Sequence, residues 1–219
     1  MKGKRKKADQ PARTTGPQQA RSRISHNKVL QATERLMTRL GTADFSLPDV
    51  SRESGMSIGG IYRRFKDKQD LLLAVQERLN EQMSEGFDTI EAQAQRHHGS
   101  LRRLTDTLTA GLAELVRRHA PMIKAIMEAT WVYPEVAKGG KRAFAAHRRR
   151  FKAQVLALRP AITHPDPDFA AEFCFVVVFE LLASHFGVGR RARPEHSKWP
   201  VLVKELQLLC YTYLAGRRD

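Results

Sequence analysis

Hydrophobic residues recur at helical spacing from about residue 25 to the end of the chain. In residues 25–40 they fall on one helix face, at Val29, Leu30, Leu36, Met37 and Leu40. The same spacing, with Ser, Asp or Pro at most helix starts, predicts further helices over residues 46–55, 57–65, 67–95, 100–119, 121–133, 134–158, 167–186 and 198–214. Pro121 is expected to separate two helices, and Gly139 with Gly140 to weaken the start of the next. No segment alternates like a strand, so the sequence predicts an all-α fold.

The first 24 residues differ from the rest. Lys and Arg are set there among Gly, Pro, Gln and Ser, without apolar periodicity, so burial cannot offset the entropy of ordering. We therefore expect a disordered basic arm over 1–24, a small helical domain over 25–70 and a larger helical domain over 71–219. Two roles for the arm stay open: a solubilising tail, or an arm that contacts phosphates or a minor groove.

Residues 46–65 have the layout of a helix-turn-helix. Ser46 and Asp49 form the sequence pattern of a capping box, Gly55 suits the tight turn, and Ser57 caps the second helix. Four apolar side chains can form the small core between the two helices: Val50, Met56, Ile61 and Phe65. In a helix-turn-helix the second helix enters the major groove of DNA.

The second helix and its flanks have the residue types that DNA binding needs. Gly59 and Gly60 permit a close backbone approach, while Arg side chains bind phosphate or guanine. Tyr62 could instead cover the core, and the Arg side chains could be solvated charges. The candidate DNA-contacting residues are Ser46, Ser57, Ile58, Gly59, Gly60, Tyr62, Arg63, Arg64, Lys66 and Lys68.

The order and spacing of these residues resemble the TetR family of transcriptional regulators over about 45 residues. The resemblance rests on Val29, Leu30, Ala32, Leu36, Gly41, Val50, Gly55, Met56, Ser57, Gly59, Ile61, Tyr62, Phe65, Lys68, Leu71 and Leu72. It implies phosphate contacts from Tyr62 and Lys68, with Ile58, Gly59, Gly60, Arg63 and Arg64 facing or flanking the groove. The chain departs from the family at Gly60, where a phosphate-binding Thr is common. Arg64, where the family often has His, is expected to compensate.

The resemblance also implies an N-terminal three-helix DNA-binding domain followed by a larger ligand-binding and dimerisation domain. The last two helices, about 167–186 and 198–214, would pair with those of a second copy, and a single monomeric core is the alternative. Candidate residues for an effector pocket are Met122, Ile126, Met127, Trp131, Phe144, His147, Phe151, Phe175 and Phe179. Such residues are more often plain core than pocket lining.

Charge and composition narrow the function. The chain has 38 Lys and Arg against 23 Asp and Glu, a formal charge of +15, which favours a polyanionic partner, either nucleic acid or an anionic membrane surface. No nucleophile–base pair, carboxylate pair or metal-type cluster emerges, so we expect no enzyme activity, no cofactor and no metal. No apolar run is long enough to cross a bilayer, and the two cysteines, Cys174 and Cys210, fit a reduced cytoplasmic location.

Together with the helix-turn-helix, the resemblance to the TetR family implies a homodimeric repressor that binds palindromic double-stranded operator DNA and is released by a small-molecule effector. The alternative is an architectural DNA-binding protein without an effector, which would show weak sequence preference.

Overall fold

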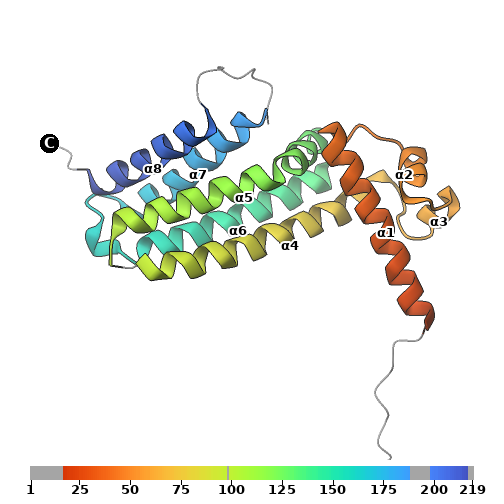
Figure 1. The fold of residues 1–219 in the computed structure, drawn as a ribbon, viewed down its shortest axis with the longest axis horizontal. Coiled ribbons are helices and arrows are strands. Elements are labelled where there is room, and N and C mark those ends of the chain that lie inside the picture. Colours follow the sequence, from red (N-terminus) through yellow and green to blue (C-terminus); the bar gives the residue numbers. More distant parts are fainter. Residues whose placement is uncertain (1–16, 98, 188–197, 217–219) are drawn as a thin grey trace, which may run out of the picture.

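The molecule is an elongated stack of helices with a small helical unit at one end (Figure 1). The computed structural model describes residues 17–97, 99–187 and 198–216. Within these residues the α-helices are α1 (Pro17–Leu40), α2 (Leu47–Ser54), α3 (Ile58–Tyr62), α4 (Lys68–Ala94), α5 (Leu101–Ala129), α6 (Pro134–Leu156), α7 (Pro167–His185) and α8 (Trp199–Ala215). Short 3₁₀ turns follow α4 and α6. The described part contains no strand, which confirms the all-α prediction.

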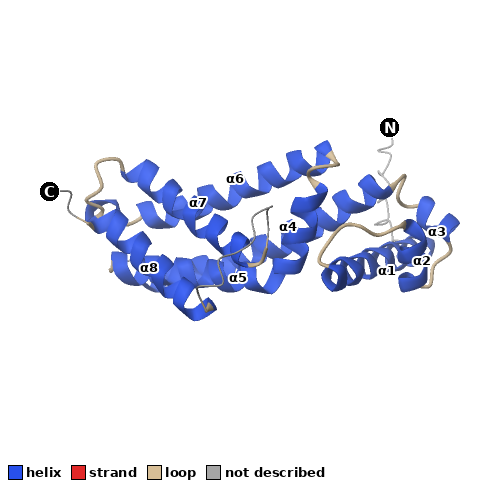
Figure 2. Ribbon diagram, turned by 90° about the horizontal axis from the view of Figure 1, so that it is seen from above, coloured by secondary structure: helices blue, strands red, loops and turns tan. Residues whose placement is uncertain are grey.

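The helices form two groups joined by α4. Helices α1, α2 and α3 pack together at one end, and α4 runs from that end into the bundle of α5, α6, α7 and α8 (Figures 1 and 2). In the bundle α4 packs against α5 and α6, while α5 also packs against α7 and α8. Helix α1 contacts α5 as well as α2. The long α4 is therefore shared by both groups.

The start of α1 corrects the predicted arm. The helix begins at Pro17 rather than near residue 25, so residues 17–24 are helical. Proline is favoured in the first helical turn, because its missing N–H has no helical partner there in any case. Gln, Ala and Arg, which follow it, are good helix formers that extend an already nucleated helix at little cost. Residues 1–16 of the expected arm lie outside the described residues.

The predicted break at Pro121 is also wrong. Helix α5 continues through this proline, although a proline inside a helix costs about 3 kcal/mol. Side chains on both sides of it, among them Val116, Ala120 and Ile123, are buried in one core. Continuous burial of one helix face offsets the local cost, so tertiary packing overrides the sequence signal.

Helix α6 is likewise unbroken at Gly139 and Gly140. Gly139 is buried because the Gln76 side chain of α4 occupies the space beside it: a Cβ there would lie 2.2 Å from Gln76 Oε1. Gln76 Nε2 donates a hydrogen bond to the Val136 carbonyl at 2.9 Å. The glycine thus serves a close contact between two helices. No helix in the described residues is long and apolar enough to cross a membrane.

Candidate functional site

The helix-turn-helix begins with the capping box that the sequence predicts. The Ser46 backbone N–H and hydroxyl both donate to the Asp49 carboxylate, at 2.8 and 2.5 Å, and the Asp49 N–H donates back to Ser46 Oγ at 3.4 Å. These hydrogen bonds from Ser46, aided by Arg52, lower the pKa of Asp49 to about 2. Both donors of Ser46 are therefore committed within the chain. The structure assigns Ser46 to capping and gives no support to its expected DNA contact.

The turn that follows fixes the angle between α2 and α3. Gly55 has a φ of 63°, in the left-handed region that favours glycine. Ser51 Oγ donates to the Met56 carbonyl at 2.6 Å, and the Gly60 N–H donates to Ser57 Oγ at 3.2 Å. The turn and the start of α3 are thus held by side chains of small polar residues.

A compact core supports α3 from beneath. Val50, Ile61 and Phe65 are buried, as the sequence predicts. His26 of α1 stacks on the Phe65 ring, with centroids 4.8 Å apart, a contact that the sequence pattern did not reveal. α3 is shorter than expected, ending at Tyr62 instead of near Phe65, because two glycines leave it a weak helix. Its outer face is therefore positioned mainly by this core.

Five of the candidate residues lie on that outer face. Ile58 and Tyr62 are 42% and 54% exposed, and Ser57, Gly59 and Arg63 are exposed beside them. The exposed Ile58 and Tyr62 side chains offer surface for contact with a partner. These five residues, Ser57, Ile58, Gly59, Tyr62 and Arg63, form what we call the recognition face.

Gly60 and Arg64 are placed differently from the prediction. Gly60 is buried against Ser57 and Met56 instead of facing outward, because its place on α3 turns toward the turn and the core. Arg64 is half-buried and donates from Nη1 to the Gly60 carbonyl at 2.8 Å, while its Nε is buried without a partner. Arg64 thus closes the end of α3, and Arg63 carries the exposed charge.

The start of α4 adds two lysines. Lys66 is exposed, and its backbone N–H donates to Asp70 at 3.0 Å. Lys68 Nζ lies over the Phe45 ring, 4.5 Å from its centroid. Partial burial lowers the pKa of Lys68, and cation–π contact accounts for its position. In the sequence, both lysines follow within a few positions of Arg63, the last residue of the recognition face.

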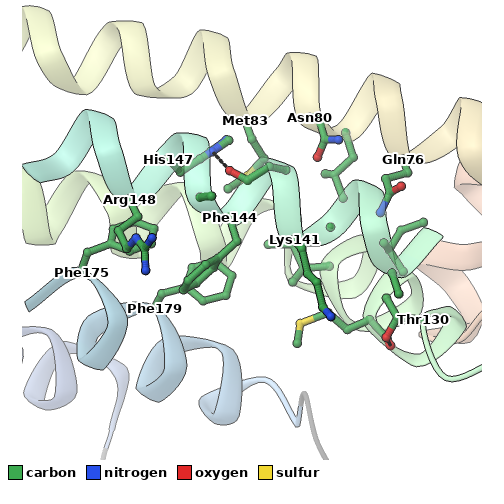
Figure 3. Close-up of a pocket in the computed structure, with 18 of the residues that line it drawn as sticks. Gln76, Asn80, Met83, Thr130, Lys141, Phe144, His147, Arg148, Phe175 and Phe179 are labelled. Carbon is green, nitrogen blue, oxygen red and sulfur yellow. Dashed lines mark hydrogen bonds between the residues drawn. The ribbon is translucent and has the colours of Figure 1, made fainter. Parts of the chain in front are cut away.

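A cavity of about 490 Å³ lies among α4, α5, α6 and α7 (Figure 3). Of the residues predicted for an effector pocket, six line it: Ile126, Met127, Phe144, His147, Phe175 and Phe179. Three do not. Met122 faces a smaller crevice beside α1, Trp131 is 64% exposed, and Phe151 is buried in the core against Phe175. A linear pattern cannot separate these cases, because the relative rotation of packed helices decides them.

The sequence prediction missed the polar lining of the cavity. Gln76, Asn80, Thr130, Lys141, Arg148 and Glu180 all contribute. The signal available for the first two was their place on the same face of α4 as Leu79, Met83 and Phe87. Polar residues on an otherwise buried helix face are an indication of a binding site or of a buried hydrogen bond.

His147 is the most perturbed titratable group of the cavity wall. Burial, with the nearby Arg150 charge, lowers its pKa to about 4. Its ring meets Phe87 edge-on at 4.6 Å, and its Nε2 is buried without a partner. The imidazole is therefore neutral at pH 7. No cluster of metal-ligating side chains occurs within the described ranges.

Comparisons with known proteins agree with this geometry. Residues 29–75 match the family model described as bacterial regulatory proteins, tetR family, which covers the helix-turn-helix and the start of α4. No curated protein sequence matches the chain.

Solved structures extend the likeness to the whole fold. A transcriptional regulator of Rhodococcus sp. Rha1 has a TM-score of 0.70 at 19% identity, over 88% of this chain and 97% of that one. A TetR transcription regulator of Haloarcula marismortui has 0.64 at 16%, over 88% and 97%. The regulator FadR of Bacillus subtilis, solved with stearoyl-CoA, has 0.63 at 13%, over 88% and 100%. Residues 29–75 are therefore similar to the DNA-binding regulators that the tetR model describes, and the chain as a whole shares the fold of these solved regulators.

Proposed function

We propose that the chain is a dimeric repressor that binds an inverted-repeat operator and leaves it when a small molecule fills the cavity. The observation that supports this most is the path of α4. This helix starts at Lys68, directly after the recognition face, and supplies Gln76 to the cavity wall. The two residues are eight positions apart, about 12 Å along a helix. A shift of α4 caused by a ligand is thus transmitted to the DNA-binding end.

The DNA contacts are proposed from exposure and chemistry. Ile58, Gly59 and Arg63 of the recognition face would meet base edges, while Tyr62, Lys66 and Lys68 would bind phosphates. The exposed Ser57 would add a phosphate contact at the start of α3. Arg64 is proposed only as a secondary contact, because its Nη1 is already bonded within the chain.

The dimer is proposed from an unpartnered apolar surface on α7 and α8. Six large hydrophobic side chains there are 37–54% exposed in the single chain: Phe169, Phe173, Leu181, Val201, Leu208 and Leu209. Apolar patches of this kind on a soluble chain mark protein interfaces. A second copy fits best, because a two-fold dimer presents two recognition faces to successive major grooves about 34–36 Å apart.

Selection of bound DNA from a random pool tests the operator. We expect an inverted repeat whose half-sites are about one helical turn apart. Recovery of unrelated sequences with weak preference would instead support the architectural DNA-binding protein and refute the repressor. A reporter gene with the selected operator over its promoter then separates repression from activation.

Sedimentation velocity tests the dimer. Leu181→Glu on α7 places a charge in the proposed interface, so we expect monomers at micromolar concentration. Val132→Glu, at a 70% exposed apolar residue between α5 and α6, is the matched control and should leave the dimer intact. A Leu181→Glu protein that remains dimeric would place the interface elsewhere.

A further inference from the structure

The cavity is long and narrow. On α4 its lining runs from Gln76 to Phe87, and on α6 from Ala137 to Arg148. Each wall covers eleven helical steps, which is about 16 Å. A volume of about 490 Å³ over that length leaves a mean cross-section of about 30 Å². This suits one alkyl chain or one ring seen edge-on, and it excludes a peptide helix, which is about 10–12 Å across.

The two ends of the cavity differ in chemistry. Gln76 and Asn80 on one wall and Thr130 on the opposite wall lie toward the end nearer the DNA-binding helices, and Phe175 and Phe179 toward the other end (Figure 3). Ring contacts between Phe144, Phe175 and Phe179, with centroids 5.2–6.0 Å apart, make the far end an aromatic wall. An amphipathic molecule would match this polarity, with its head near Gln76 and its body among the rings.

The charge at the polar end comes from Lys141. Its side chain extends toward the side where Thr130 lies (Figure 3). Lys138, one turn earlier on α6, is paired with Glu135 at 2.6 Å, whereas Lys141 makes no ion pair in the part of the chain that the structure describes. Arg148, the other cation of the lining, lies 3.7 Å from Glu172, and Glu180 is the one carboxylate of the lining that the structure describes. Among the described residues, Lys141 is therefore the cation of the lining that makes no ion pair.

We infer that the effector is an elongated amphipathic carboxylate, with its head at Lys141, Asn80 and Gln76 and an unbranched apolar body against Phe144, Phe175 and Phe179. The inference rests on the proposed function, since it names the ligand class of the proposed effector site. Lys141 supplies the charge, and the Asn80 and Gln76 amides supply hydrogen bonds that an alcohol would use less well. A fatty acid or an arylalkanoic acid has this chemistry.

Titration calorimetry on the DNA-free protein tests the ligand class. The probe is decanoate below its micelle concentration, with decan-1-ol as the uncharged body and acetate as the head alone. We expect one decanoate per chain, decanol at least about tenfold weaker because the charge-assisted hydrogen bond is lost, and no binding of acetate. Equal binding of decanoate and decanol, or no binding of decanoate, would overturn the proposal.

Variants locate the head group. Lys141→Gln should remove most of the preference for decanoate over decanol, and Lys141→Arg should restore it. Lys138→Gln, which removes a nearby lysine outside the cavity lining, should leave the preference unchanged. A Lys141→Gln protein that folds normally and keeps the tenfold preference would refute the assignment.

The experiments test the ligand class and the release from the operator separately. Calorimetry involves no DNA, so its failure rejects the carboxylate and leaves the operator selection untouched. If decanoate binds with the expected preference but does not release the selected operator, the ligand class stands and release by an effector is rejected.

Discussion

Two adjacent glycines in α3 offer a matched test of how the recognition face is built. At Gly59 a Cβ would meet no atom within 4 Å, whereas at Gly60 it would lie 3.2 Å from Ser57 Oγ and 3.4 Å from Met56 Cε. Alanine in place of glycine stabilises a helix by roughly 0.5–1 kcal/mol. Gly59→Ala should gain this amount in full, which corresponds to a rise in Tm of up to about 2–4 °C for a chain of this size.

Gly60→Ala should gain little or lose stability. The added methyl group displaces Ser57 Oγ, which accepts the Gly60 N–H at 3.2 Å, and loss of such a cap costs about 0.5–2 kcal/mol. Gly59→Ala should therefore raise the stability of the protein, whereas Gly60→Ala should lower it or leave it nearly unchanged, although the substitution is the same.

At Gly59 the alanine substitution should raise the stability of the protein and lower its affinity for DNA. Because this residue is exposed on the recognition face, a methyl group there holds the backbone away from DNA. The displaced backbone would lose the phosphate contact proposed for the neighbouring Ser57, and loss of one hydrogen bond to a charged phosphate weakens binding at least about tenfold. Thermal unfolding and fluorescence anisotropy on the selected operator measure both effects. A Gly59→Ala protein that is less stable, or that binds the operator as well as the wild type, would refute this account of α3.

Three further outcomes follow from the same structure. Burial lowers the pKa of His147 from 6.5 to about 4, so between these pH values the unfolded chain binds a proton that the folded chain does not. The free energy of unfolding should therefore fall by up to about 3 kcal/mol as the pH drops from 6.5 to 4. Urea titrations of His147→Gln should lack this loss. Phe151→Ala, in the core, should cost about 3–5 kcal/mol in chemical denaturation, while Phe144→Ala on the cavity wall should cost less; equal losses would contradict the distinction. Lys68→Gln should weaken binding to all DNA sequences alike and reduce the slope of log affinity against log salt by about one; a sequence-dependent loss would assign Lys68 to a base.

The helix starts could be predicted because their signals are local. Ser46 with Asp49, Asp67 before α4, and Asp166 with Pro167 before α7 each form the cap that their spacing implies. Hydrogen bonds of this kind join residues three or four positions apart, so the sequence itself contains both partners.

The cavity could be predicted only in part, because its lining depends on how helices rotate against one another. Phe144 and Phe151 are seven positions apart and share a face of α6, yet Phe144 lines the cavity and Phe151 is 1% exposed in the core. Gln76 contacts α6 across 60 positions of sequence. No local signal marks such a pairing, and the sequence pattern accordingly yielded only part of the apolar lining and none of the polar end.

Under the proposed function, Gln76 is the side chain that would couple the cavity to the DNA-binding end. Its side chain is 3% exposed, and its amide bridges α4 to the Val136 carbonyl at the start of α6. A buried amide that loses its partner costs about 1–3 kcal/mol, so this bond helps to hold α4 against the start of α6. A carboxylate head at Lys141 would offer the amide N–H a charged acceptor in exchange for that carbonyl. Energy is then available to release α4 from α6, about two helical turns from Lys68. In the proposed mechanism, the polar end of the cavity would thus serve for recognition and for response through the same side chain.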